Sequence, residues 1–313
     1  GDEVIVPSLT FVATANVVKY CEAEPVFVDC DDETLCLNVE KLRIFLKMEC
    51  EQKDNGYTYN RTSGRRVKAI IPVHIFGHPV EMDALLEICQ LYNIDIIEDA
   101  TESLGSEYKG GKTGSFGKLA CLSFNGNKII TTGGGGMVVT NDSGLAERVK
   151  HLSTQAKNDP LEYDHDEIGY NYRLTNIQAA MGVAQMESLD KFIEIKRENA
   201  HRYQNLLSSC KGLELLWEKP WVRSNFWFYT IRVSKDHKKP LVDYLIFRNI
   251  QVRPVWKPIH TLRMYKDCQA YEIESAINIY DTAFNLPCSV SLKENERLFV
   301  VKNINEYFTR LYT

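Results

Sequence analysis

The first half of this chain alternates short apolar runs with segments of helical spacing, and this alternation limits its fold more than any other feature. The six runs that we predict to be strands are Val4–Val6, Pro25–Val28, Ala69–Val73, Ile94–Ile97, Leu119–Phe124 and Met137–Thr140. The segments with helical spacing are Thr10–Tyr20, Val39–Lys47, Val80–Leu91 and Gly144–Leu152. Because most of the strands are apolar on both faces, we expect a mostly parallel sheet covered by helices. The sequence therefore predicts a doubly wound α/β domain that binds its ligands beyond the carboxyl ends of the strands.

The second half of the chain changes character after a long helical segment. We expect one helix from about Thr175 to Leu206, then strands near Phe226–Val233 and Gln251–Pro254 and helices near Pro240–Phe247 and Glu294–Leu311. This order predicts a large domain over residues 1–206, which ends in the connecting helix, and a smaller C-terminal α+β domain over residues 207–313. The polar segments 49–66 and 153–167 are expected to be loops, the first of them an insertion or a lid.

Two residues at the ends of predicted strands suggest a specific chemistry. Lys128 follows the run Leu119–Phe124 and precedes the glycine run Gly133–Gly136, and Asp99 ends the run that begins at Ile94. Pyridoxal phosphate needs an amine that holds its aldehyde as a Schiff base, and a carboxylate that keeps its ring nitrogen protonated. Taken alone, each residue has a plainer interpretation, as a solvated loop lysine or as a helix cap. Their occurrence together, in a chain with this order of elements, predicts a site for that cofactor.

Composition argues against several other classes of function. The formal net charge is −5 and the basic residues form no stripe, so nucleic acid and an anionic membrane surface are poor candidates for the main partner. No apolar run reaches the length of a membrane span. The nine cysteines are scattered, with no C-x-x-C pair and an odd total, which is typical of reduced thiols. We therefore expect a cytoplasmic protein without a disulfide framework or a zinc site.

Three motifs that would indicate other ligands fail on their spacing. Gly110-Gly-Lys-Thr113 resembles the end of a phosphate-binding P-loop, but position 106 is Ser where that motif needs Gly. The run Gly133–Gly136 lacks the dinucleotide-binding spacing and precedes a strand rather than a helix. His74 and His78 flank a Phe-Gly turn after a strand, and no third metal ligand is evident near them. We expect no metal site.

Five stretches of the sequence together form a highly specific pattern. They are G-D-E-V-I-V-P-S-L-T-F-V-A-T-A-N (1–16), P-V-H-I-F-G-H-P-V-E-M-D (72–83), E-D-A-T-E-S-L-G-S (98–106), S-F-N-G-N-K-I-I-T-T-G-G-G-G (123–136) and G-Y-N-Y-R-L-T-N-I-Q-A-A (169–180). With them the chain resembles, over nearly its whole length, the DegT/DnrJ/EryC1/StrS family of pyridoxal-phosphate-dependent sugar aminotransferases. The form S-F-N-G-N-K before four glycines looks most like the LegC-type branch, which acts on nucleotide-linked 4-keto-6-deoxy sugars in making legionaminic acid and related surface glycans. The resemblance implies the PLP fold type I, with a large doubly wound domain and a smaller C-terminal domain.

The resemblance also assigns roles to individual residues. Lys128 matches the lysine that forms the internal aldimine and later serves as the base that moves a proton between substrate and cofactor. Asp99 matches the partner of the pyridinium nitrogen, and Phe11 matches the aromatic residue that stacks on the cofactor ring. Glu102 falls where many members have Gln against the phenolic oxygen, and a carboxylate there would repel a phenolate unless one of them is protonated. Ser123 matches a hydroxyl that binds the cofactor phosphate.

Other matching residues imply contacts with a second subunit and with the substrate. Asn171 and Arg173 lie in the segment that, in the family, reaches the cofactor phosphate of the neighbouring subunit, so the resemblance implies a homodimer with shared active sites. Trp256, Lys257 and His260 lie in a stretch that resembles the one closing over the sugar. The implied reaction moves an amino group from glutamate to C4 of a UDP-linked 4-keto-6-deoxy-2-acetamido sugar.

The resemblance leaves alternatives open. Family members carry, before their first matching strand, a small-residue turn and a helix N-terminus that bind the cofactor phosphate. This sequence begins after that segment, so we expect it to hold the cofactor less tightly. An aminotransferase acting on another keto-sugar nucleotide fits the same residues, whereas a dehydratase of the family would carry His in place of Lys128. A non-catalytic or truncated paralogue that acts through dimerisation is the alternative from another class.

Overall fold

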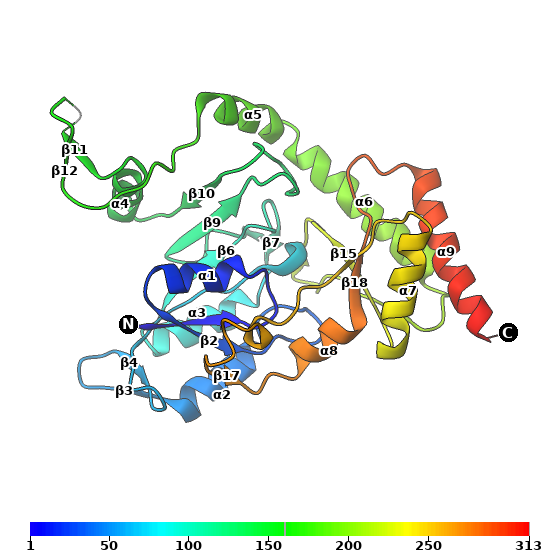
Figure 1. Cartoon of the computed structure of the whole chain (residues 1–313), viewed down its shortest axis with the longest axis horizontal. Coiled ribbons are helices and arrows are strands. Elements are labelled where there is room, and N and C mark those ends of the chain that lie inside the picture. The colour runs from blue at the N-terminus through cyan, green and yellow to red at the C-terminus, as the bar shows by residue number, and fades with distance from the viewer. Residues whose placement is uncertain (160, 313) are drawn as a thin grey trace.

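The largest sheet is mostly parallel and has seven strands (Figure 1). The computed structural model describes residues 1–159 and 161–312, and within them the strand order is β10-β9-β6-β5-β1-β2-β17. The strands are β1 (Glu3–Pro7), β2 (Glu24–Val28), β5 (Val67–Ile70), β6 (Asp95–Asp99), β9 (Leu119–Ser123), β10 (Gly136–Val139) and β17 (Ala270–Tyr271). Neighbouring strands run parallel, except that β9 and β10 are antiparallel. The expected doubly wound α/β sheet is confirmed.

Helices cover both faces of this sheet. The four that follow its strands are α1 (Ala13–Tyr20), α2 (Val39–Glu49), α3 (Met82–Leu91) and α4 (Ser143–Ser153). Successive residues of a strand point to opposite faces. Ile5 therefore packs with Leu42 of α2 and Leu85 of α3, whereas Val6 packs with Ala15 of α1 on the other face. Both faces are buried, which explains why these strands are apolar throughout.

The segment 49–66 is a hairpin rather than a lid over the predicted site. Its strands are β3 (Cys50–Gln52) and β4 (Thr58–Asn60). The Asn60 side chain donates a hydrogen bond to Glu3 at the start of β1, and the Thr58 hydroxyl donates to the carbonyl of Tyr92 just before β6. These contacts hold the hairpin at the amino ends of the strands, whereas Asp99 lies at a carboxyl end. The prediction of a lid was wrong, because the buried polar residues of the segment bind the opposite edge of the sheet.

The expected single helix over residues 175–206 is two helices. They are α5 (Asn176–Met186) and α6 (Leu189–Leu207), separated at Glu187 and Ser188. Helix α5 begins with a capping box between Thr175 and Gln178 and buries none of its side chains in this chain. Helix α6 is amphipathic and buries one face. The two helices thus separate where the chain passes from an exposed helix to a partly buried one. The separation includes Ser188, and serine is a poor residue for a helix interior.

The C-terminal part has its own antiparallel sheet and hydrophobic core. The sheet order is β13-β15-β18-β16, with strands β13 (Leu213–Leu215), β15 (Tyr229–Val233), β16 (Arg253–Pro254) and β18 (Ala283–Leu286). Helices α7 (Lys235–Phe247), α8 (Ser275–Thr282) and α9 (Glu294–Tyr312) accompany it, and α7 and α9 lie on the right in Figure 1. Its core also includes Tyr203 and Leu207 of α6, and strand β17 joins the large sheet instead. The division at residue 206 stays a prediction.

The remaining elements are short. Strands β7 (Glu107–Tyr108), β8 (Gly111–Lys112) and β14 (Val222–Arg223) form a small sheet, and β11 (Lys157–Asp159) and β12 (Asp164–His165) form a hairpin in the segment 153–167. Two 3₁₀ turns, η1 (Ile75–Gly77) and η2 (Ile259–Thr261), complete the described chain. All nine cysteines are free. Among the helices of residues 1–159 and 161–312, none is both long and apolar enough to cross a bilayer.

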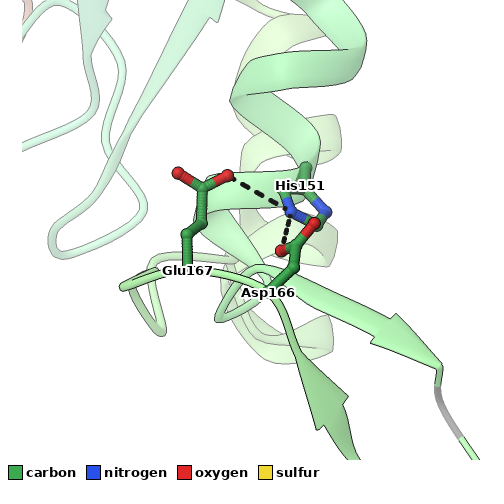
Figure 2. A group of neighbouring side chains, drawn as sticks. All are labelled: His151, Asp166 and Glu167. Atoms are coloured by element: carbon green, nitrogen blue, oxygen red, sulfur yellow. Dashed lines mark hydrogen bonds and ion pairs between the residues drawn. The ribbon is translucent and has the colours of Figure 1, made fainter.

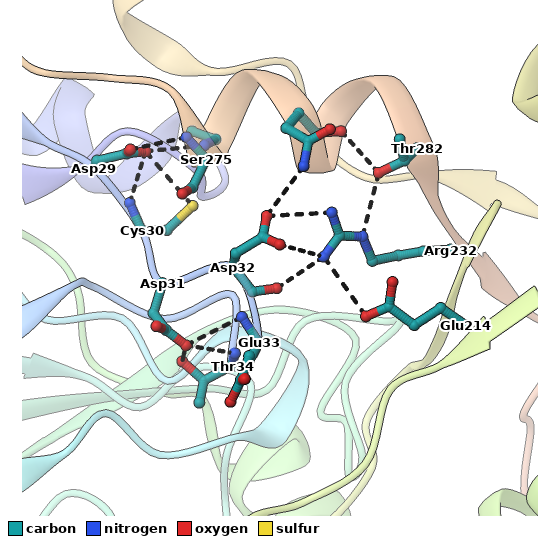
Figure 3. A network of polar contacts seen from close by, with 12 residues as sticks. Asp29, Cys30, Asp31, Asp32, Glu33, Thr34, Glu214, Arg232, Ser275 and Thr282 are labelled. Atoms are coloured by element: carbon teal, nitrogen blue, oxygen red, sulfur yellow. Dashed lines mark hydrogen bonds and ion pairs between the residues drawn. The ribbon is translucent and has the colours of Figure 1, made fainter. Parts of the chain in front are cut away.

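A buried polar network joins the loop after β2 to the C-terminal part (Figure 3). Figure 3 shows Asp29 beside Ser275 at the start of α8. The Asp29 carboxylate accepts hydrogen bonds from three backbone amides there, at 2.8–2.9 Å, and from Lys41 Nζ at 2.7 Å. Burial by itself raises the pKa of Asp29, but the hydrogen bonds from Lys41 and α8 outweigh it and leave this pKa below its ordinary value. Nearby, Asp32 accepts from the buried Arg232 guanidinium at 2.9 Å. Charged hydrogen bonds thus hold the two sheets together.

Candidate active site

Lys128 is largely buried in the turn that follows β9. Its side chain is 12% exposed, and its Nζ lies 3.7 Å from Oε1 of Glu102. The same nitrogen lies 3.9 Å from the ring centroid of Trp227, whose indole N–H donates to the carbonyl of Asn127 at 2.8 Å. Burial lowers the pKa of Lys128, and the charges of Glu102 and Asp99 oppose this shift only in part. Its amine therefore loses a proton more readily than that of a surface lysine, which suits a nucleophile or a base.

Glu102 is buried beside this amine. Its Oε2 accepts a hydrogen bond from the backbone amide of Phe76 at 2.8 Å. Burial raises the pKa of Glu102 to about 8, although Lys128 and the Phe76 amide both lower it. Desolvation is the larger effect, because the side chain is only 2% exposed.

Asp99 is held in place at the carboxyl end of β6 by two hydroxyl groups. Thr14 of α1 donates to its Oδ2 at 2.7 Å, and Thr101 donates to its Oδ1 at 2.6 Å. Oδ1 also accepts the backbone N–H of Thr101 at 3.2 Å, so Oδ2, which accepts a single hydrogen bond, keeps acceptor capacity. The side chain is half-buried and acts electrostatically on both Lys128 and Glu102. Asp99 can therefore receive an N–H from a ring placed between these groups.

Aromatic side chains form one wall of the site. Phe11 is 53% exposed, and its ring centroid lies 6.0 Å from that of Trp256. The rings of Trp256 and Phe76 lie 4.9 Å apart, and Trp256 also stacks with Trp227 at 6.5 Å. Phe11 is therefore not a core residue but one end of a series of rings that leads to Lys128. Such a wall suits a flat heteroaromatic ring or the apolar face of a sugar.

The remaining predicted site residues are His260, Lys257, Ser123, Asn171 and Arg173. His260 lies next to β1, and its Nδ1 is 2.6 Å from the hydroxyl of Ser8, which follows that strand. Lys257 is exposed and has no polar partner within the part of the chain that the structure describes. Ser123 ends β9, and its hydroxyl accepts the backbone N–H of Asn125 at 3.3 Å. Asn171 and Arg173 are exposed in the segment that follows α4 and its hairpin, and Asn171 forms an isolated antiparallel β-bridge with Thr154. Within one chain the structure gives Asn171 and Arg173 no contact with Lys128.

Sequence reasoning missed several residues that shape the site. The Trp227 ring contacts the Lys128 amine, and the Phe76 backbone amide contacts the Glu102 carboxyl group. Each pair is distant in the sequence, and no local pattern indicates either contact. Thr14 was within reach of prediction, since a hydroxyl in the first turn after a strand can face a neighbouring strand end. Backbone pairing also fixes Asp99, because its N–H donates to Pro72 and its carbonyl accepts from His74.

The two histidines considered as a metal pair have separate structural roles. His74 is fully buried, its Nδ1 accepts the backbone N–H of Val80 at 3.1 Å, and its Nε2 therefore donates to Glu98 at 3.0 Å. The ring of His78 packs edge-on against Phe226, and burial lowers the pKa of His78 to about 4. They do not share a metal site.

Figure 2 shows three other side chains with potential metal-ligand atoms close together. His151 of α4 lies 2.8 Å from Asp166 and 3.5 Å from Glu167, which follow the β11–β12 hairpin. The Arg148 guanidinium also pairs with both oxygens of Glu167. A cation bound here would compete with that arginine, so we interpret the cluster as a tie between α4 and the hairpin.

The residues around Lys128 fit pyridoxal phosphate. A buried amine with a lowered pKa can bind its aldehyde, a carboxylate at a strand end can face its ring nitrogen, and an exposed aromatic ring can cover its face. The fold and this set of residues define a pyridoxal-phosphate-dependent aminotransferase of fold type I. The chain belongs to the DegT/DnrJ/EryC1/StrS aminotransferase family, whose model matches residues 1–305.

Curated relatives and solved structures agree with this assignment. The chain is 40% identical to a GDP-perosamine synthase of Escherichia coli O157:H7, in an alignment that covers 99% of this chain and 80% of the relative. It is 38% identical to EpsN of Bacillus subtilis strain 168, described as a putative pyridoxal phosphate-dependent aminotransferase, with 98% and 78% covered. The crystal structure of a DegT DnrJ EryC1 StrS aminotransferase from Brucella abortus matches with a TM-score of 0.89 at 29% identity and covers 98% of this chain and 80% of that one.

Proposed function

We propose that this aminotransferase moves an amino group from glutamate to C4 of a nucleotide-linked 4-keto-6-deoxy sugar. The observation that carries the proposal is the buried Lys128 amine between Glu102 and the Trp227 ring, at the carboxyl edge of the sheet. Pyridoxal phosphate, when bound, supplies an aldehyde that carries the amino group and a ring that accepts electrons. Every other step falls to the protein's own side chains.

Three side chains perform the chemistry in this proposal. Lys128 would hold the aldehyde of the cofactor through its amine and, when that amine is free, would serve as the base that moves a proton at the substrate carbon. Asp99 would accept the N–H of the pyridinium ring and keep that nitrogen protonated, because Thr14 and Thr101 hold its carboxylate in one orientation. Glu102 lies beside Lys128 and would face the phenolic oxygen of the cofactor.

Aromatic and polar residues bind the two ligands. Phe11 would cover the cofactor ring, and the hydroxyl of Ser123 would bind the cofactor phosphate. Trp256 stacks on the sugar, while His260 and Lys257 bind its polar groups or the diphosphate. The structure supports this placement for Trp256, which contacts Phe11 and Phe76 on the wall of the site.

A second copy of the chain completes the site. Asn171 and Arg173 are exposed, and they would reach the cofactor phosphate of the other subunit. Helix α5 follows them and buries none of its side chains, although some are apolar: Ile177 is 79% and Val183 is 63% exposed. Apolar residues gathered on one exposed element are typical of an interface. The working unit is a homodimer with shared active sites, which acts in the cytoplasm, where it meets soluble nucleotide sugars.

The substrate we propose first is a UDP-linked 4-keto-6-deoxy-2-acetamido sugar, used for surface glycans of the legionaminic-acid type. A relative from Campylobacter jejuni, 30% identical over 95% of this chain and 77% of its own, is a UDP-4-amino-4,6-dideoxy-N-acetyl-beta-L-altrosamine transaminase. A GDP-linked keto sugar is the second candidate, because the Escherichia coli relative is a GDP-perosamine synthase.

The test is turnover of both candidate substrates with pyridoxal phosphate and glutamate. We expect amino-sugar product from one of them with the wild type and none with Lys128→Ala. Full activity of Lys128→Ala would overturn the assignment of the lysine. Absence of product with every keto-sugar nucleotide, together with absence of cofactor binding, would favour a paralogue that acts only through dimerisation. A dehydratase is disfavoured by the lysine at position 128.

A further inference from the structure

Ser8 and His260 meet just beyond the carboxyl end of β1. They are 252 residues apart in the sequence, and Oγ of Ser8 lies 2.6 Å from Nδ1 of His260. The backbone carbonyl of Ser8 also accepts the N–H of Ile259 at 2.8 Å, so the turn η2 is tied to the end of the strand twice. Three residues after Ser8 and four before His260, the rings of Phe11 and Trp256 lie 6.0 Å apart. His260 therefore borders the aromatic wall at the carboxyl edge of the sheet.

The burial of Ser8 decides which of the two groups donates the hydrogen bond. Ser8 is fully buried, and within residues 1–159 and 161–312 its hydroxyl has no partner other than His260. A serine hydroxyl has one hydrogen, and a buried donor that finds no acceptor costs free energy. The Ser8 hydroxyl therefore donates to Nδ1, and the ring proton of neutral His260 lies on Nε2.

The second ring nitrogen of His260 is free to bind a ligand. Nε2 has no hydrogen-bond partner in the described part of the chain. It is also not one of the buried atoms without a partner there, which are Nε of Arg66 and Nε of Arg297, so solvent reaches it. Burial lowers the pKa of His260, and the charge of Asp29 opposes this shift only in part. Nε2 is an N–H donor in either charge state, because a protonated ring carries a hydrogen on both nitrogens.

We propose that Ser8 is a positioning residue that holds His260 in one orientation, and that the Nε2–H of His260 binds an anionic oxygen of a substrate. Phosphate and carboxylate oxygens only accept hydrogen bonds, which suits a donor of fixed direction. Two sources can supply such an oxygen, the diphosphate of the nucleotide sugar and a carboxylate of the amino donor. The proposal deepens the proposed function, on which it rests for these two ligands. The hydrogen bond from Ser8 to His260 stands independently of it.

The direction of this hydrogen bond is measured by ¹⁵N NMR of the full chain, labelled at its histidine rings, without cofactor at about pH 8. The chain has seven histidines, and His260→Gln identifies the signals of His260 by removing them. We expect the wild type to carry the proton on Nε2 and none on Nδ1. In Ser8→Ala the two signals move toward each other, because the ring exchanges between its tautomers.

Two results of the NMR measurement would overturn the proposal. One is a proton on Nδ1 in the neutral wild type, and the other is a pair of signals that Ser8→Ala leaves unchanged. If Ser8→Ala does not fold, the wild-type spectrum alone decides the direction of the hydrogen bond.

The ligand is identified by calorimetric titration of the protein incubated with pyridoxal phosphate. The probes are UDP, GDP and glutarate, a dicarboxylate without an amino group. The matched control is Thr58→Val, which removes another fully buried hydroxyl, one that donates to the carbonyl of Tyr92 at the opposite edge of the sheet. We expect Ser8→Ala to weaken the binding of one class of probe about three- to tenfold, and Thr58→Val to weaken neither.

The outcomes of the titration separate the two sources of the oxygen. Weaker binding of a nucleotide assigns the oxygen to the diphosphate, and weaker binding of glutarate assigns it to a carboxylate. Unchanged binding of every probe in Ser8→Ala, or an equal loss in Thr58→Val, would overturn the role of Ser8. If no probe binds the wild type, the proposed function is overturned instead, and the NMR result remains valid.

Discussion

At the scale of single residues, the site combines groups whose burial works against their charge. Desolvation raises the pKa of Glu102 and lowers the pKa of Lys128, so it favours the uncharged form of each group. Asp99, in contrast, is half-buried and held by two hydroxyl groups. A lysine whose pKa is lowered loses its proton more readily and is then ready to react with an aldehyde. The cost of this arrangement is stability, because the folded chain must bury groups that water would ionise.

The pH dependence of stability is the first prediction. Glu102 has a pKa of about 8 when folded and an ordinary value of 4.5, so the folded state binds more protons between these values and stability falls as the pH rises through them. Glu102→Gln removes this fall. We expect the variant to be more stable than the cofactor-free wild type at pH 8, by up to about 4 kcal/mol, and the difference to shrink toward pH 5. Urea unfolding at pH 5 and pH 8 measures it, and parallel pH profiles for the two proteins would contradict it.

At the scale of elements, Asp29 links the loop after β2 to the start of α8. We expect Asp29→Ala to lower the free energy of unfolding by about 3 kcal/mol, because it leaves Lys41 and three backbone amides at the start of α8 without their buried acceptor. The pKa of Asp29 is lowered on folding, so its contribution is present at neutral pH and is lost as the pH falls through that lowered value. Chemical unfolding at pH 7 checks the loss.

The matched control for Asp29→Ala is Asp142→Ala, which removes the N-cap of the exposed helix α4. We expect a smaller loss from this variant, since water can replace the cap. Equal losses in the two variants would show that Asp29 does not join the sheets.

The order of elements in the first half of the chain could be predicted from the sequence, and so could the proximity of Lys128 and Asp99. Strands buried on both faces are apolar throughout, and the residues at their carboxyl ends meet at one edge. The contacts of Trp227 and Phe76 could not be predicted, because they depend on how the C-terminal part packs against the large sheet. The break after Met186 and the position of segment 49–66 were missed for the same reason, since each depends on contacts between distant residues.

At the scale of the whole molecule, the exposed helix α5 is the feature that one chain does not explain. Its capping box makes it a well-formed helix, yet its apolar side chains face solvent in the single chain. We expect Ile177→Asp to raise the dissociation constant of the dimer by at least about tenfold, because the dimer would bury the new charge. Light scattering coupled to size-exclusion chromatography measures this. Phe247→Asp, on the exposed end of α7, is the control, and an equal effect of both variants would contradict the assignment of α5.

The central claim is that Lys128 binds pyridoxal phosphate and that glutamate supplies the amino group. The most direct test is the absorption spectrum of the purified chain with added pyridoxal phosphate, before and after glutamate, for wild type and Lys128→Ala. We predict a visible band in the wild type that glutamate shifts to the ultraviolet, and no such band in the variant. A band that is the same in both proteins, or that glutamate leaves unchanged in the wild type, would contradict the account.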